Sequence, residues 1–108
     1  MGLKEYLEIQ MAEKNISGKE IERRSEGDVT DTHISAIRTG KSNNPTLRVM
    51  LGIAKALEVD PIEVFKAAAE VEEEKEGWTV QTLSRAIRKV PSLKPNEIKQ
   101  IKKLLKIE

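Results

Sequence analysis

The chain has 108 residues, of which 38% are hydrophobic, 34% charged and only 3% aromatic, and its formal net charge is +1. This length suits one domain, or one domain with an appendage, and so few aromatic side chains argue against a thick β-sandwich or barrel. The lack of cysteine excludes disulfides, thiolate catalysis and cysteine zinc sites. The single histidine leaves little for a metal site or a catalytic triad. No apolar run approaches the ~20 residues of a membrane helix.

The N-terminal residues predict two short helices. Apolar side chains recur at helical spacing in residues 3–14, at Leu3, Leu7 and Met11. Asn15 closes this helix, and Ile16 is expected to fill the core from the loop. The segment Ser17–Glu20 has the pattern of a capping box, in which each end satisfies a free backbone N–H of the other. A second helix is therefore expected over about residues 18–26.

Three further start signals follow in the next 35 residues. Thr30 is expected to cap a third helix that buries Ile34 and Ile37 and stops at Gly40. Thr46 caps a fourth helix, whose predicted apolar stripe is Leu47, Met50, Leu51, Ala54 and Leu57. Asp60 and Pro61 start a fifth helix, which carries Ile62 and Phe65.

After residue 69 the composition changes, and we expect three parts. Residues 1–69 form a helix-turn-helix domain with a net charge of −1, and residues 70–76 form an acidic helix end or linker with a net charge of −4. Residues 77–108, with 8 Lys and Arg against 2 Glu, form a basic helical extension. Its first helix is expected to use Trp78 and Thr79 as staple and cap, to bear Val80, Leu83 and Ile87, and to end at Pro91; its second begins near Pro95.

The second and third predicted helices, with a short turn between them, form a helix-turn-helix pattern. In three segments the sequence resembles the Xre-type, or phage-repressor-like, helix-turn-helix regulators: ISGKEIERRS, THISAIRTGK and NPTLRVMLGIAKALEVDPIEVF. The resemblance covers about residues 3–66. It implies an all-α, five-helix, phage-repressor-like DNA-binding domain, here with a helical C-terminal extension.

The chain departs from this family at several positions. The turn at residues 26–28 is about two residues longer than the common pattern, and Glu22 stands where the family often has Ala. Gly18 stands where many members have a phosphate-contacting Gln. Met11 and Arg38 replace an Arg–Glu pair, so we expect Arg38 to be free. These departures leave the fold expected but put the usual set of DNA contacts in doubt.

The third helix supplies the candidates for reading bases, because a helix fits the major groove of DNA. If Ile34 and Ile37 face inward, the outward residues are Asp31, Thr32, Ser35 and Ala36. The hydroxyls of Thr32 and Ser35 can bond to base edges, and methyl groups can contact thymine. Asp31 has two interpretations, namely stabilisation of the helix N-terminus or acceptance of a hydrogen bond from cytosine N4.

Candidates for phosphate contacts surround this helix: Lys19, Arg23, His33, Arg38, Lys41, Asn43, Asn44 and Thr46. Each also has a plainer interpretation. His33 can be a partly exposed helix residue without a task, Arg38 and Lys41 can compensate a helix dipole, and Arg23 can belong to a solvated face.

The C-terminal extension has three interpretations. Its last helix can pack on its own domain, with Trp78 covering the fifth helix, or its basic face can contact acidic groups of DNA or membrane. It can also pair with a second copy, in which case the predicted dimer contact is Ile98, Ile101, Leu104 and Leu105.

The leading functional expectation is a sequence-specific DNA-binding transcriptional regulator that acts by occupying an operator. No acidic residue occurs from Thr32 to Leu57, where five basic groups fall, and such a face suits a polyanion. The alternative is a protein-interaction module, antitoxin-like or regulator-binding, which the acids near the turn favour.

No catalytic constellation stands out, so we expect neither an enzyme nor a cofactor. With residues 1–10 too charged for a signal peptide, we expect a cytoplasmic protein whose partners are double-stranded DNA and a second copy, without a membrane.

Overall fold

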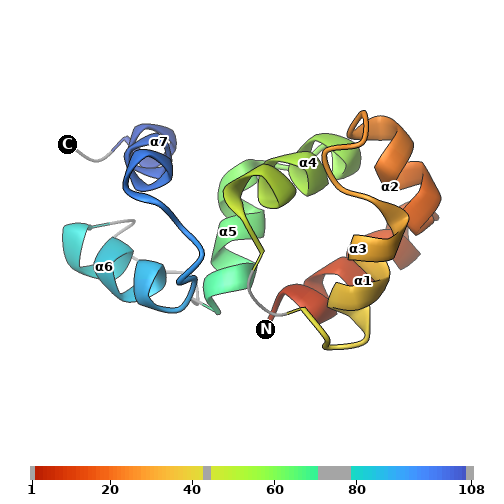
Figure 1. The fold of residues 1–108 in the computed structure, drawn as a ribbon, viewed down its shortest axis with the longest axis horizontal. Helices are drawn as coiled ribbons and strands as arrows, with labels where there is room; N and C mark the ends of the chain where they lie inside the picture. Colours follow the sequence, from red (N-terminus) through yellow and green to blue (C-terminus); the bar gives the residue numbers. More distant parts are fainter. Residues whose placement is uncertain (1, 43–44, 71–78, 107–108) are drawn as a thin grey trace.

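The computed structural model describes residues 2–42, 45–70 and 79–106, and these residues form seven α-helices without a strand. Their bounds are α1 Leu3–Lys14, α2 Gly18–Arg24, α3 Asp31–Arg38, α4 Leu47–Leu57, α5 Pro61–Ala69, α6 Val80–Arg88 and α7 Pro95–Leu105 (Figure 1). The expected all-α class, with five helices followed by a helical extension, is confirmed. In the described part of the chain no helix is long and apolar enough to cross a membrane.

The helices begin where local capping chemistry predicts. The side chains of Ser17, Thr30, Thr46 and Asp60 accept hydrogen bonds of 2.9–3.3 Å from backbone N–H groups of the first turns of α2 to α5. Thr79 caps α6 in the same way, by accepting from Thr82 N–H at 3.1 Å. Each bond satisfies a donor that has no partner within its helix. The predicted start signals are therefore confirmed.

Two details of the predicted helix ends are corrected. Glu20 does not reach back to Ser17, because its carboxylate bonds instead to Arg23 and Arg24 one turn further along. Only half of the predicted capping box therefore forms. The helix α2 also ends at Arg24, two residues early, because Glu26 and Gly27 adopt left-handed backbone conformations with φ of 56° and 84°.

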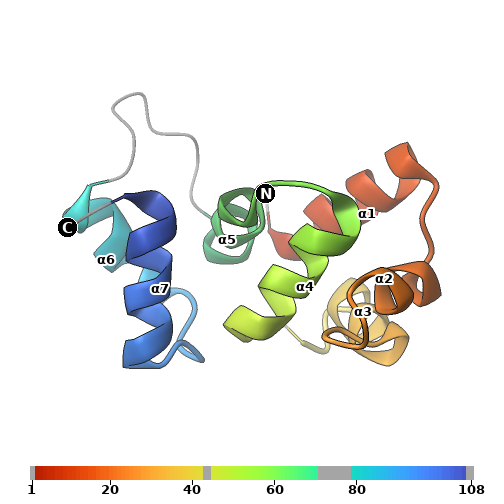
Figure 2. The same cartoon turned by 90° about the horizontal axis from the view of Figure 1, so that it is seen from above.

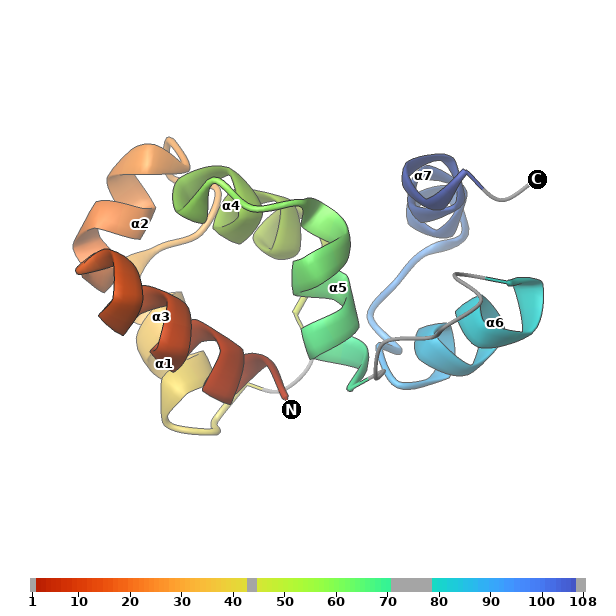
Figure 3. The same ribbon diagram turned by 180° about the vertical axis from the view of Figure 1, so that it is seen from behind.

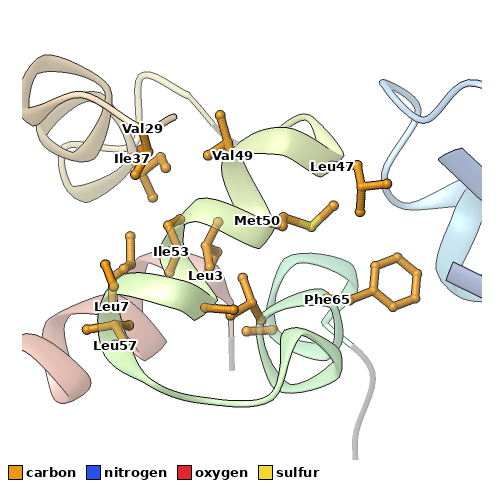
Figure 4. Close-up of a cluster of buried hydrophobic side chains, with 14 of the residues drawn as sticks. Leu3, Leu7, Val29, Ile37, Leu47, Val49, Met50, Ile53, Leu57 and Phe65 are labelled. Carbon is orange, nitrogen blue, oxygen red and sulfur yellow. The ribbon is translucent and has the colours of Figure 1, made fainter. Parts of the chain in front are cut away.

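One continuous core joins all seven helices, and it includes the loop residues Ile16 and Val29. Figure 4 shows part of this core, with Val29 among its labelled residues. The predicted stripe of α4 is confirmed except at Leu51, whose side chain is 37% exposed. Because α4 packs against both α2 and α5, its buried arc is broad and takes in Val49 and Ile53. Leu51 lies outside this arc, one turn from Arg48 and from Lys55 on the exposed side of α4.

The C-terminal helices pack on the N-terminal five. Both α6 and α7 contact α5, and the buried residues Leu83, Ala86, Val90 and Ile101 belong to the same core. Leu47 and Phe65 lie on the side of the core that faces these helices (Figure 4). Of the expected residues of this region, Trp78 lies outside the described residues, as does the side chain of Val80.

Candidate nucleic-acid interface

The helix-turn-helix consists of α2, the turn 25–30 and α3, and two polar side chains fix its geometry. The hydroxyl of Ser25, which is fully buried, accepts from Val29 N–H at 3.2 Å and lies 3.2 Å from the Glu22 carbonyl. The Glu22 carboxylate accepts from Asp31 N–H at 2.8 Å, at the first residue of α3. Glu22 thus ties the two helices together across the longer turn.

The outward face of α3 brings together all four predicted base-reading residues. A shallow hollow of about 350 Å³ is lined by Asp31, Thr32, Ser35, Ala36, Thr39 and Lys41. Thr32 and Ser35 are exposed, whereas Ile34 and Ile37 are buried as predicted. Figures 1 and 3 show α3 in front of α1 from one side and behind it from the other, so α1 covers the opposite face of α3. The outward face is therefore open to a ligand.

Thr39 was missed by sequence reasoning. It is the C-cap residue of α3 and lines this hollow with an exposed side chain, whose hydroxyl donates to the carbonyl of Ala36 at 3.3 Å. Its spacing from Ser35, four residues earlier, is the signal that could have found it, because such residues share one helix face.

A second hollow of about 390 Å³ adjoins the first and adds Arg38 and an acid from α1. Its lining includes Glu8, Gly18, Arg38 and also Asp31, which borders both hollows. No ion pair involves Arg38 among the described residues, as expected from the missing family pair. The lining of the two hollows carries charges of both signs: the positive charges of Lys41 and Arg38 are offset by the negative charges of Asp31 and Glu8.

The departure at Gly18 has a structural reason. A Cβ built on this residue would collide with the carboxylate of Asp31 and would lie 3.5 Å from a methyl group of Ile34. The glycine therefore allows the first turn of α3 to approach the start of α2. The same approach places the Asp31 carboxylate against the position at which many members of the resembled family have a Gln.

The predicted phosphate-contacting residues occupy different environments. Lys19, Arg38 and Lys41 are exposed and make no ion pair with any described residue. His33 is half-buried, and Thr46 is exposed at the start of α4. Asn43 and Asn44 lie outside the described residues. Lys19, Arg38, Lys41 and Thr46 therefore remain candidates for phosphate contacts.

Arg23 is less available, because it shares the Glu20 carboxylate with Arg24. The hydrogen bonds that Arg23 and Arg24 donate to Glu20 lower the pKa of this carboxyl to about 2. Glu20 consequently stays ionised at neutral pH and compensates one of the two guanidinium charges.

Two cations of the acid-free segment are paired, which sequence reasoning did not predict. Arg48 Nε lies 3.1 Å from Asp28 Oδ1, and Lys55 Nζ lies 3.1 Å from Glu26 Oε2. The acids come from the longer turn, so the insertion that widens the helix-turn-helix also neutralises two charges of α4. The basic surface is smaller than the sequence alone indicates.

Comparison with known proteins assigns the chain to a protein family. Residues 6–70 match the Cro/C1-type helix-turn-helix DNA-binding domain, and this match spans more than half of the chain. The chain therefore belongs to the Cro/C1-type helix-turn-helix family, which confirms the resemblance to phage-repressor-like regulators. No curated protein and no solved structure gave a significant match.

Proposed function

We propose that the chain is a cytoplasmic, sequence-specific transcriptional regulator that works by occupying an operator rather than by catalysis. The observation that carries this proposal is the outward face of α3, where Asp31, Thr32, Ser35 and Ala36 share one hollow with Lys41. An exposed helix with polar and methyl-bearing side chains suits the edges of bases in the major groove. The membership in a DNA-binding family supports the same function.

In this proposal the residues divide into two sets. Thr32 and Ser35 bond to base edges and Ala36 contacts a thymine methyl group, whereas Lys19, Arg38, Lys41 and the N-terminus of α4 hold phosphates. An ionised Asp31 can only accept hydrogen bonds, and in the major groove the donors are the exocyclic amines of cytosine and adenine; cytosine N4 is the partner proposed here. It also repels phosphates, so it favours specific over non-specific contacts.

We also propose that two copies bind half-sites one helical turn apart, because one module of this size contacts too few base pairs for a unique genomic site. The proposed contact uses the exposed Leu104 and the half-buried Ile98 and Leu105 of α7, of which Leu105 also packs against the core of its own chain. Leu104 is 43% exposed, but Ile101 is 1% exposed and packs in its own chain. Ile101 is therefore corrected from a surface contact to a core residue, because α7 turns this side chain toward α5.

A specific observation favours one second function, a protein-interaction module. The acids Glu8, Glu22 and Asp31 gather at the start of α3 and lower the positive potential there. A protein partner with basic side chains would suit these acids.

Selection from a pool of random duplexes, followed by competition titration, separates the two functions. The regulator proposal expects a preferred sequence that binds about 10³-fold or more tightly than mixed DNA. A chain that binds every duplex equally weakly would favour the protein-interaction module.

A further inference from the structure

A hydrogen bond anchors the loop between α6 and α7 beside the candidate DNA interface. Ser92 Oγ donates to the carbonyl of Pro45 at 2.7 Å, across 47 residues of sequence. Pro45 directly precedes Thr46, the cap of α4, in the segment that also follows Lys41. The loop 89–94 is therefore held against the segment that presents the proposed phosphate contacts.

This loop carries unpaired positive charge. Lys89 and Lys94 are both exposed, and neither makes an ion pair with a described residue. The Cα atom of Lys94 lies within about 7 Å of that of Ser92, because two residues cannot span more. Residues 77–108 as a whole hold 8 Lys and Arg against 2 Glu.

The position of Lys94 has no explanation in helix stability. Lys94 is the N-cap of α7, yet its side chain makes no capping hydrogen bond, and Glu97 has to cap its backbone N–H at 2.9 Å. A cation at a helix N-terminus is disfavoured by the helix dipole, and lysine is not a favoured N-cap residue. The ammonium group of Lys94 therefore takes no part in capping α7 and is exposed to a ligand outside the chain.

The loop also lies on the appropriate side of the molecule. Figure 2 shows α3, the first turn of α4 and the first turn of α7 along the same lower edge. A duplex lying along α3 and the start of α4 would continue toward the start of α7.

We propose that the loop between α6 and α7 extends the DNA interface, with Lys89 and Lys94 contacting phosphates beyond those reached by α3 and the start of α4. This inference rests on the proposed DNA-binding function. It gives the C-terminal extension a part in binding, in addition to its packing on α5.

The test compares full-length variants on a long mixed-sequence duplex over a range of salt concentrations. Lys89→Gln with Lys94→Gln removes the two proposed contacts. The control, Lys103→Gln with Lys106→Gln, removes the same charge from the far end of α7. These two residues lie at least about 14 Å from Lys94 along the helix axis, which exceeds the Debye length of about 8 Å. Loss of two phosphate contacts makes the slope of log affinity against log salt about 1.8 units shallower.

When the salt concentration rises from about 50 to about 200 mM, the affinity of the wild type should fall about tenfold further than that of the Lys89/Lys94 variant. The affinity of the control pair should fall as far as that of the wild type. Lys94→Ser should in addition raise the melting temperature, since serine caps a helix, while weakening DNA binding. Such a combination excludes unfolding as the cause.

Three outcomes would overturn the proposal. Equal slopes for the wild type and the Lys89/Lys94 variant would leave DNA binding intact but place the loop outside the interface. Equal losses in both variant pairs would mean that net charge alone acts. A wild type that does not bind the duplex at low salt would refute the DNA-binding function itself, and this inference with it.

Discussion

Asp31, at the start of α3, is constrained through both its backbone and its side chain. Its backbone N–H is bonded to Glu22, and its carboxylate occupies the space that a side chain at position 18 would need. Gly18 lies in the first turn of α2, where alanine would otherwise favour the helix by about 1 kcal/mol. The conflict between these two effects is measurable.

We predict that Gly18→Ala and Asp31→Ala are coupled. In the wild-type background the new methyl group must displace the Asp31 carboxylate, whereas in Asp31→Ala it meets only an ordinary van der Waals contact with Ile34 at 3.5 Å. Gly18→Ala should therefore be less favourable by about 1 kcal/mol or more in the wild type than in Asp31→Ala, measured by urea unfolding of the four proteins. Additive effects would show that the two residues do not compete for space.

A second residue-scale prediction separates base reading from phosphate contact. Thr32→Ala should weaken binding to the preferred duplex by about 1–3 kcal/mol and leave mixed DNA almost unaffected. Lys41→Ala should weaken both duplexes similarly and make the salt slope shallower by about one unit. If both substitutions act equally on every duplex, α3 does not read bases.

At the scale of elements, the turn between α2 and α3 controls charge as well as geometry. Its acids Glu26 and Asp28 pair with Lys55 and Arg48 of α4, and both pairs are exposed to solvent. Exposed pairs contribute little to stability, typically about 0–1 kcal/mol. Their larger effect is on the field that an approaching duplex meets.

We therefore predict that Glu26→Gln with Asp28→Asn raises the affinity for mixed DNA several-fold at low salt and changes stability by less than about 1 kcal/mol. The matched control, Glu13→Gln with Glu58→Gln, removes two acids at the C-terminal ends of α1 and α4. The measurements are the affinity of both variants for mixed DNA and their thermal unfolding. An equal rise in the control would mean that only net charge counts.

The helices themselves could be predicted because their start signals are local. Ser17, Thr30, Thr46 and Asp60 act within three residues, so their chemistry is visible in the sequence. The outward row of α3 followed from helical periodicity in the same way. The exposure of Leu51, the Glu22–Asp31 bond and the Ser92–Pro45 bond could not be predicted, since each depends on how distant helices approach.

At the scale of the whole molecule, the C-terminal helices complete the core. They pack on α5, and Phe65, which is 2% exposed, lies on the side that faces them. The buried core residues from Leu3 to Leu57 come from α1 to α4 and the loops between them, not from the extension. The extension therefore adds to a core that the first five helices already form.

Truncation after Gly77 should accordingly leave a folded protein of lower stability. Exposure of Phe65 alone should cost about 1.5–3 kcal/mol, seen as a lower melting temperature with retained helical circular dichroism. The fragment should sediment as a monomer. In a separate titration it should bind DNA half-sites weakly. An unfolded fragment would make the extension an essential part of the core, and a dimeric one would place the interface before residue 77.

The central claim, that this chain binds DNA through phosphates around α3, is tested most directly by the salt dependence of its binding to a mixed duplex. If five or six phosphates are neutralised per protomer, log affinity should fall with log salt at a slope near −5, as about 0.9 counterion is released per contact. A fluorescence titration of the full-length chain over several salt concentrations gives this slope. A flat dependence, or no binding at low salt, would contradict the account.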